Sequence, residues 1–296
     1  MAGEALEREG ARLLAEAEAR LMGDIGAPDA KAAYALVEQS ARLGHSDGRR
    51  AWVYLTAAGI GRAADPEAAR AMLAELARED RFAEVQLAFL DHMSCERLAA
   101  KAVAETLCED PPVRIVPKLF SAAECRYLML LGAPWLRTAM IIDDITGEGR
   151  IDPKRDAQTS DFPPLAEDLV VQSINRAIAT ATGTRPEWGE PLNILRYGPG
   201  QQYRPHFDAG GGERPEDFRH WTALIWLNED YAGGETHFPE LKLKVRGGVG
   251  DLLMFRNVDL EGRADPRLLH AGLPVTDGIK WMASRWIRSR DFLASR

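Results

Sequence analysis

The chain has 296 residues, of which 46% are hydrophobic, so it is long and apolar enough for one or two domains with substantial cores. Its formal net charge of -8 argues against nucleic-acid binding driven by bulk electrostatics, because such binding needs a basic surface. The first residues lack the basic and apolar regions of a signal peptide, and no apolar run approaches the length of a membrane span, so we expect a cytoplasmic protein without membrane segments.

Residues 1–107 are rich in Ala, Leu and Glu and are predicted to form helices. Residues 29–37 match residues 65–73 at a shift of 36 positions (65 − 29). A period in the middle thirties, built from helix pairs, is typical of a solenoid, in which each pair buries its apolar face against the next. This segment is similar to the SEL-like branch of the tetratricopeptide repeats. The resemblance implies a concave face that holds a peptide or protein; a helical cap that only stabilises the second domain is the alternative.

Residues 108–117 mark the predicted boundary between two domains, because their three prolines end a helix and favour an extended chain. Ser121 and Glu124 form a capping box, so a helix is expected to begin there. Residues 140–162 are polar and charged, which is typical of a lid or of a mobile surface loop. Residues 165–180 are predicted to form an amphipathic helix that packs behind a sheet. The cysteines are odd in number and lack metal-site spacing, so reduced thiols are expected at Cys95, Cys108 and Cys125.

Three short strands are predicted at residues 222–228, which are apolar and partly β-branched, at residues 233–238 after a turn, and at residues 250–255 before a long loop. Such strands suggest a sandwich or jelly roll. His206 and Asp208 lie two positions apart, so in an extended strand they share a face and can bind one ion, and His270 would complete a trio. Two His and one carboxylate are the ligand set of non-haem Fe(II) oxygenases. Zinc is the alternative ion, but the His-Glu-x-x-His pattern that supplies a zinc hydrolase with its general base is missing from the sequence.

The segments that carry a family resemblance are residues 195–203, 205–208, 219–228, 233–239, 250–255, 269–271 and 278–281. Together they resemble the catalytic domain of the prolyl 4-hydroxylases, within the 2-oxoglutarate and Fe(II)-dependent dioxygenases. A fainter resemblance extends upstream through residues 119–125 and 158–160. The resemblance implies an α+β fold, with an α-helical repeat domain (residues 1–107) followed by a double-stranded β-helix, or jelly roll, oxygenase domain (residues 108–296, with a catalytic core at about 190–290).

The resemblance also implies roles for the candidate site residues. His206, Asp208 and His270 are expected to hold Fe(II), with His237 as the rival of His270. Lys280 is expected to pair with the distal carboxylate of 2-oxoglutarate, because a dianion in an apolar barrel needs a fixed cation. The expected catalytic residues are thus His206, Asp208, His270 and Lys280, and the expected cofactor-binding residues are Lys280, Tyr197, Thr222 and Trp286.

The roles of two residues near the site, Trp286 and Arg219, have alternatives. Trp286 shares a strand face with Lys280 and is either part of the cosubstrate site or a core tryptophan. Arg219 is expected in a structural ion pair, with substrate contact as the alternative. The role of Lys280 further requires that the turn at residues 277–278 carries the chain from one sheet to the other, because a simple hairpin would turn Lys280 away from the metal trio.

The implied activity is hydroxylation of an unactivated C–H bond, with conversion of 2-oxoglutarate and O2 to succinate and CO2. The implied substrate is a prolyl residue in a peptide or protein, which the helical repeats would help to hold. A free amino acid or small metabolite is the alternative among enzymes. A repeat-based interaction protein with an inactive oxygenase domain is the alternative outside them. Ascorbate dependence and oligomeric state are left open.

Overall fold

The computed structural model describes residues 2–93, 103–142, 149–150, 154–210 and 218–295. They form two compact units. The helical unit comprises Met1–Ala99, Phe162–Arg176 and Phe292–Arg296, and the β unit comprises Ala100–Asp161 and Ala177–Asp291. A domain boundary at residues 107 and 108 stays a prediction, and the helical unit also takes two segments from much later in the chain.

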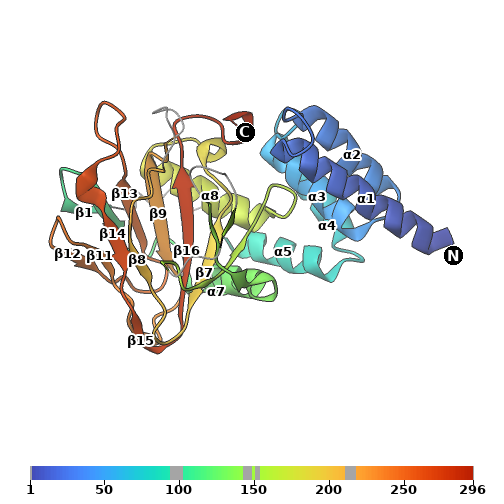
Figure 1. Ribbon diagram of the computed structural model, residues 1–296. Coiled ribbons are helices and arrows are strands. Elements are labelled where there is room, and N and C mark those ends of the chain that lie inside the picture. Colours follow the sequence, from blue (N-terminus) through green and yellow to red (C-terminus); the bar gives the residue numbers. More distant parts are fainter. Residues whose placement is uncertain (1, 94–102, 143–148, 151–153, 211–217, 296) are drawn as a thin grey trace. The chain divides into compact units, whose positions relative to one another are not determined.

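The N-terminal part of the helical unit consists of antiparallel helices that pack in succession, α1 on α2, α2 on α3, α3 on α4 and α4 on α5 (Figure 1). Their bounds are α1 (Ala2–Met22), α2 (Ala30–Arg42), α3 (Ser46–Ala58), α4 (Pro66–Leu76) and α5 (Arg81–His92). Small and aliphatic side chains fill the interfaces, so the helices can approach closely. One cluster consists of Ala17, Leu21, Ala33, Val37, Ala51 and Leu55.

The segments that match in sequence begin successive helices with the same kind of cap. The Asp29 carboxylate accepts a hydrogen bond from the backbone N–H of Ala32 at the start of α2, and Asp65 accepts one from Ala68 at the start of α4. An aspartate at this position satisfies a backbone donor that has no partner within the helix. The shift of 36 residues (65 − 29) therefore corresponds to a repeated structural feature as well as a repeated sequence.

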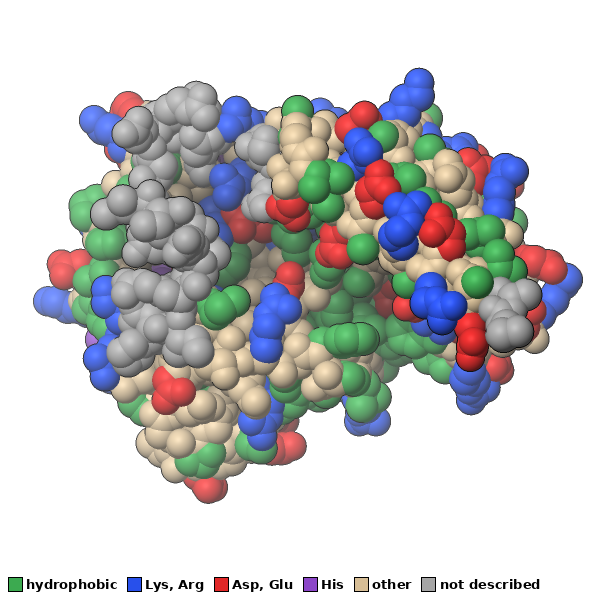
Figure 2. Space-filling view, turned by 45° about the vertical axis from the view of Figure 1, so that its right-hand side comes forward, with side chains coloured by type: hydrophobic (Ala, Val, Ile, Leu, Met, Phe, Trp, Pro, Cys, Tyr) green, Lys and Arg blue, Asp and Glu red, His purple; other side chains and the backbone are tan. Residues whose placement is uncertain are grey.

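Acidic and basic side chains are mixed over the visible face of the helical unit (Figure 2). Several form pairs three or four positions apart on one helix, as Arg12 does with Glu9 and Glu16, and Arg42 with Glu38. Exposed pairs of this kind stabilise a helix only weakly, because solvent screens them. The stability of the unit therefore depends mainly on its apolar interfaces.

The β unit is built on an eight-stranded antiparallel sheet with strand order β1-β2-β13-β9-β16-β7-β6-β3. These strands are β1 (Glu105–Cys108), β2 (Val113–Val116), β3 (Arg137–Thr138), β6 (Gln158–Asp161), β7 (Asn193–Tyr197), β9 (Trp221–Trp226), β13 (Leu252–Arg256) and β16 (Lys280–Ile287). A four-stranded sheet of order β12-β11-β14-β8 contains β8 (Tyr203–His206), β11 (Thr236–Phe238), β12 (Leu243–Val245) and β14 (His270–Gly272). Two further pairs are β10 (Tyr231–Gly233) with β15 (Val275–Gly278), and β4 (Ile141–Ile142) with β5 (Gly149–Arg150).

The apolar core of the β unit lies between these two sheets. Trp226 and Phe255 from the large sheet and Phe238 from the small sheet are fully buried in one cluster. The rings of Phe238 and Phe255 meet edge to face, with centroids 5.0 Å apart. Two antiparallel sheets that share a core form a sandwich, so the predicted α+β fold with a jelly roll is confirmed.

The last three strands cross from one sheet to the other, as the role of Lys280 requires. β14 belongs to the small sheet, β15 pairs with β10, and β16 lies in the middle of the large sheet between β9 and β7. Gly278, at the end of β15, has a φ of +72°, a conformation that glycine adopts without strain. The chain therefore makes no simple hairpin at this turn.

The remaining elements flank these strands. Helix α7 (Ala122–Gly132) begins at Ser121, where the predicted capping box is present. Helix α8 (Leu169–Thr182) begins four residues later than predicted (169 − 165), because the Asp168 carboxylate accepts hydrogen bonds from the N–H groups of Val170 and Val171. The rest are the short helices η1 (Ala133–Trp135), η2 (Pro186–Trp188), η4 (Pro266–Leu268) and η5 (Leu293–Ser295).

Within residues 140–162, the predicted lid or loop, the described part forms strands β4, β5 and β6, whereas residues 143–148 and 151–153 lie outside the described residues. Cys108 and Cys125 are free thiols, and Cys95 also lies outside the described residues. None of the helices described is both long and apolar enough for a membrane span.

Candidate metal centre

His206, Asp208 and His270 bring one ligand atom each to within 4.8 Å of one another. The Nε2 atom of His206 lies 3.4 Å from Oδ1 of Asp208, and Nε2 of His270 lies 3.4 Å from Oδ2. His206 ends β8 and His270 begins β14, and the two residues lie opposite each other in the small sheet. Neighbouring strands thus bring together residues that are 64 positions apart in sequence (270 − 206).

Backbone carbonyls orient both imidazoles. Nδ1 of His206 donates to the carbonyl oxygen of Arg204 at 2.8 Å, and Nδ1 of His270 donates to that of Leu268 at 3.0 Å. A carbonyl oxygen only accepts, so the proton lies on Nδ1 and the lone pair of each Nε2 faces Asp208. This tautomer is the one that a metal ligand needs.

A short hydrogen-bond relay orients the carboxylate. The Thr222 hydroxyl, on β9, donates to Oδ2 of Asp208 at 2.8 Å, and Nδ2 of Asn257 donates to the Thr222 oxygen at 2.9 Å. All three side chains are buried. Thr222 therefore contacts the carboxylate of the candidate metal centre, and it lies outside the group of residues that line the neighbouring cavity.

The three groups are electrostatically coupled. Burial alone would raise the pKa of Asp208, but the adjacent His270 and His206 outweigh it and hold that pKa well below its usual range. Burial, together with His270, lowers the pKa of His206. Burial also opposes protonation of His270, yet the Asp208 carboxylate outweighs it and raises the pKa of that imidazole. An ionised acid between two imidazoles is a ready donor set for a divalent cation.

Lys280 lies in the cavity that these ligands border. It is 3% exposed, and its Nζ atom donates to the carbonyl oxygen of Gly234 at 2.5 Å and lies 5.6 Å from the Tyr197 ring centroid. Burial lowers the pKa of Lys280 to about 7, although the nearby Glu235 opposes the shift. A buried ammonium group beside a metal site favours a carboxylate ligand.

Comparison with known proteins agrees with the metal-site geometry described above. Residues 192–288 match the model of the 2OG-Fe(II) oxygenase superfamily. Prolyl 4-hydroxylase 1 of Arabidopsis thaliana is 31% identical over 211 residues, which cover 63% of this chain and 72% of that protein. The chain belongs to the prolyl 4-hydroxylase family. It is accordingly a 2-oxoglutarate-dependent dioxygenase that uses Fe(II), 2-oxoglutarate and O2.

Two further relatives of this prolyl 4-hydroxylase family member show how far the likeness extends. The alpha-1 subunit of prolyl 4-hydroxylase from Mus musculus is 31% identical over 200 residues, which cover 65% of this chain and 37% of that subunit. The crystal structure of the viral collagen prolyl hydroxylase of Paramecium bursaria Chlorella virus-1 in complex with 2OG aligns with a TM-score of 0.50 and 27% identity. That alignment covers 62% of this chain and 99% of the viral one.

The donor set of the enzyme fits iron(II). Two neutral imidazole nitrogens and one carboxylate oxygen converge from one side, and the cavity with Lys280 lies beside them. This arrangement leaves coordination positions open for a chelating cosubstrate and for O2. Assignment of the metal to His206, Asp208 and His270 remains a proposal, and it follows from this geometry.

The other predicted site residues of the dioxygenase separate into two groups. Tyr197 and Trp286 line the cavity together with the ligands and Lys280. Arg219 forms the expected ion pair, because its Nε and Nη2 atoms donate to the two oxygens of Glu190 at 2.8 and 2.9 Å. Its guanidinium carbon also lies 4.0 Å from the Trp286 ring centroid. Arg219 is thereby held against Trp286, a residue of the cavity wall.

His237, the rival ligand, lies outside the metal cluster found among the described residues. It pairs with Ala271 across β11 and β14, and its neighbours Thr236 and Phe238 are the buried residues of that strand. Because side chains alternate along a strand, His237 faces away from the core that contains them.

Sequence reasoning did not single out Thr236 and Arg155, and it considered Tyr203 as a residue that contacts the cosubstrate, lines the substrate entrance or only packs. Tyr203 stacks on the His206 imidazole, with ring centroids 3.5 Å apart and planes 16° apart. Thr236 and Arg155 also line the cavity and are buried. Thr236 follows the Gly-Gly-Glu segment that the resemblance had marked, so a signal existed, whereas Arg155 lies in a charged stretch without a recognisable pattern.

Proposed function

We propose that this dioxygenase hydroxylates a prolyl residue of a peptide or protein, and that His206, Asp208 and His270 hold the iron. The observation that carries the proposal is the single cavity bordered by these ligands and by the buried ammonium group of Lys280. Relatives named prolyl 4-hydroxylases support the choice of substrate.

Bound iron and 2-oxoglutarate supply the activation of O2, which is coupled to release of succinate and CO2 and to hydroxylation of a C–H bond. The protein's own residues prepare the site for that chemistry. The relay from Asn257 through Thr222 fixes the Asp208 carboxylate, and the Arg204 and Leu268 carbonyls fix the two imidazoles. We assign to Lys280 the neutralisation of the distal carboxylate of the cosubstrate, and to Tyr203 the exclusion of water from one side of His206.

The test is anaerobic reconstitution with Fe(II) and 2-oxoglutarate, followed by exposure to air with a panel of proline-containing peptides, with and without ascorbate. Peptide-dependent succinate release with a mass gain of one oxygen supports the proposal. Hydroxylation of free proline or another small metabolite alone would replace the peptide substrate. Absence of decarboxylation under every condition would contradict the enzymatic role. His206→Ala should lose iron and turnover together, whereas His237→Ala, outside the cluster, should retain both.

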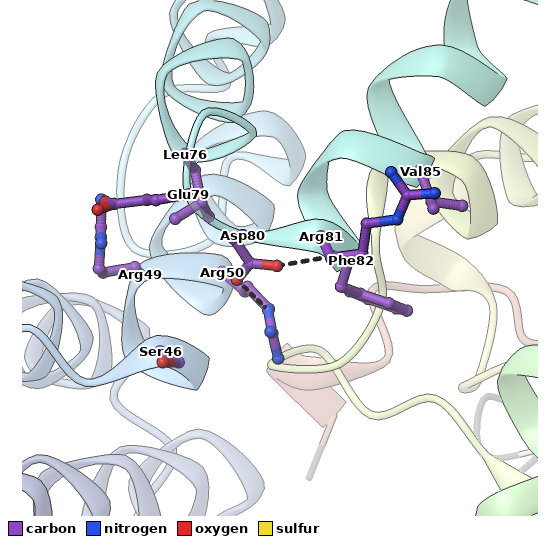
Figure 3. A pocket seen from close by; sticks show the side chains of 9 residues that line it. All are labelled: Ser46, Arg49, Arg50, Leu76, Glu79, Asp80, Arg81, Phe82 and Val85. Atoms are coloured by element: carbon purple, nitrogen blue, oxygen red, sulfur yellow. Dashed lines mark hydrogen bonds and ion pairs between the residues drawn. The ribbon is translucent and has the colours of Figure 1, made fainter.

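For the helical unit, we propose a part in holding a macromolecular substrate. A cavity of about 630 Å³ lies at the junction of α3, the end of α4 and the start of α5 (Figure 3). Arg50 lies at its centre, and its Nε atom donates to Oδ2 of Asp80 at 2.7 Å. The guanidinium carbon of Arg50 lies 5.2 Å from the centroid of the Phe82 ring, and Val85, at the edge of the cavity, is 42% exposed. A concave surface with both apolar and charged groups suits a peptide segment.

This proposal predicts that a substitution in the helical unit affects the KM of a long substrate but not that of a short one. Val85→Asp should raise the KM for a protein substrate and leave the KM for a short peptide unchanged. Val103→Asp is the matched control, because Val103 is also exposed but lies in the β unit. Equal KM values for both substrates in the Val85 variant would leave the helical unit with only a stabilising role.

A further inference from the structure

Arg155 is a buried cation to which the proposed reaction assigns no task. It is 7% exposed and lines the same cavity as the metal ligands and Lys280. Its Nε and Nη2 atoms have no hydrogen-bond partner among the residues that the structure describes. Leaving buried donors unpaired is unfavourable, and more so for a charged group. The unpaired donors therefore indicate a ligand that completes them.

The backbone fixes the position of this arginine. Arg155 forms an antiparallel bridge with Tyr203, flanked by a hydrogen bond from Asp156 N to Gln202 O at 3.1 Å and one from Arg204 N to Lys154 O at 2.8 Å. The guanidinium carbon lies 5.3 Å from the Tyr203 ring centroid, and the side chain hydrogen-bonds Tyr197. Arg155 is thus part of the cavity wall, held there by the backbone of Tyr203 and by the Tyr197 side chain.

The charge balance of the site identifies the kind of ligand. Iron(II) carries two positive charges and Lys280 one, while Asp208 carries one negative charge and 2-oxoglutarate two. These charges cancel, so Arg155 adds a positive charge that the cofactor set leaves uncompensated. A buried guanidinium is best satisfied by a carboxylate, which accepts two parallel N–H bonds.

We propose that Arg155 is a specificity-determining residue that binds a carboxylate of the substrate, an inference that rests on the proposed function. The carboxylate belongs either to a peptide, as an acidic side chain or chain terminus near the reacting residue, or to a free amino acid. Both sources present the same chemistry to the guanidinium. The enzyme would therefore prefer substrates with a negative charge close to the hydroxylated carbon.

The experiment measures binding without turnover, on the full chain loaded with Mn(II) and 2-oxoglutarate under anaerobic conditions. Three pairs of probes differ only in one carboxylate: proline peptides with Glu or Gln at each flanking position, peptides with a free or amidated C-terminus, and L-proline against L-prolinamide. The wild type should bind the acid of one pair about 10- to 100-fold more tightly than its neutral partner, the range expected for a charge-assisted contact. The pair that shows the preference identifies the source.

Arg155→Gln should remove this preference, and Arg155→Lys should restore part of it, because a lysine keeps the charge but loses the planar fork. The affinity for 2-oxoglutarate should be unchanged in both variants, which also shows that the site has folded. Arg137→Gln, which removes an exposed arginine of β3, is the matched control and should behave as the wild type.

Two results would overturn the inference. One is a fall in 2-oxoglutarate affinity in Arg155→Gln, which would assign the residue to the cosubstrate. The other is a wild type without preference in any of the three pairs. A failed proposed function looks different, because the wild type would then release no succinate with Fe(II) and 2-oxoglutarate in air, whatever the binding data show.

Discussion

At the scale of single residues, the relay to Asp208 should set the affinity for iron. Thr222→Val keeps the shape of the side chain but removes the hydroxyl that donates to Oδ2 at 2.8 Å. Partners that orient a ligand typically contribute about 10- to 100-fold to metal affinity, so we expect a loss in that range. Anaerobic Fe(II) titration measures it. Thr222→Ser retains the hydroxyl and should bind iron nearly as the wild type does; equal affinity in the Val variant would show that the relay has no such effect.

A second residue-scale prediction concerns the pH dependence of 2-oxoglutarate binding. Lys280 has a pKa of about 7 in the folded protein against an ordinary value of 10.5. Below pH 7 the ammonium is already present, whereas above pH 7 the dianion can bind well only if Lys280 takes up a proton. The affinity should therefore fall as the pH rises from 7 to 9, by up to about tenfold per unit.

Calorimetry in buffers of different ionisation enthalpy tests this linkage directly. Proton uptake on 2-oxoglutarate binding should be close to zero at pH 6 and approach one proton at pH 8. Lys280→Arg keeps a permanently charged group, so any binding that it retains should show no uptake at either pH. The same uptake in both proteins would assign the proton to another group.

At the scale of elements, β15 is the connection on which the site depends, because it carries the chain from the sheet with His270 to the sheet with Lys280. A Cβ atom added at Gly278 would lie 2.4 Å from the carbonyl oxygen of Asp230, at a φ of +72°. Gly278→Ala should therefore destabilise the protein by about 1–3 kcal/mol and weaken 2-oxoglutarate binding more than iron binding.

Thermal unfolding and separate titrations of metal and cosubstrate check this prediction. Gly248→Ala is the matched control, since its added Cβ would meet nothing closer than 3.6 Å. A Gly278 variant with wild-type stability and unchanged 2-oxoglutarate affinity would show that the crossing tolerates a side chain.

The strands also show which parts of the fold and of the site could be predicted from the sequence. Residues 222–228 and 250–255 have the pattern of short strands, and the segments with His206 and His270 carry the family resemblance, so the jelly roll was predictable. The register that places His206 opposite His270 depends on long-range pairing, which local patterns do not encode. The contact between Thr222 and Asp208 and the burial of Arg155 depend on the same pairing, and for this reason Thr222 was expected at the cosubstrate and Arg155 was missed.

At the scale of the whole molecule, the chain's halves are interleaved in sequence. The helical unit takes Phe162–Arg176 and Phe292–Arg296, and side chains from both segments pack in its cores. Leu169 is buried with Val53, Tyr54 and Leu73, and Leu293 packs on the cluster around Leu21 and Leu55. The amide of Gln172 also donates to the backbone oxygen of Tyr54 at 3.0 Å.

A fragment of residues 1–107 should consequently be less stable than the same helices in the full chain. The fragment lacks several apolar side chains of its own core, each worth about 1.5–3 kcal/mol when fully buried. In the full chain, Leu169→Ala should reproduce part of the loss, about 2–5 kcal/mol. Leu6→Ala removes a leucine that is 48% exposed on α1 and should change stability by less than about 0.5 kcal/mol.

Urea unfolding followed by circular dichroism at the helical minimum measures the stability of the full chain, the fragment and the two leucine variants. The fragment and Leu169→Ala should unfold at lower urea than the full chain, and Leu6→Ala should unfold with it. If the fragment unfolds at the same midpoint and slope as the helical transition of the full chain, residues 1–107 form a complete domain and the later segments add nothing to its stability.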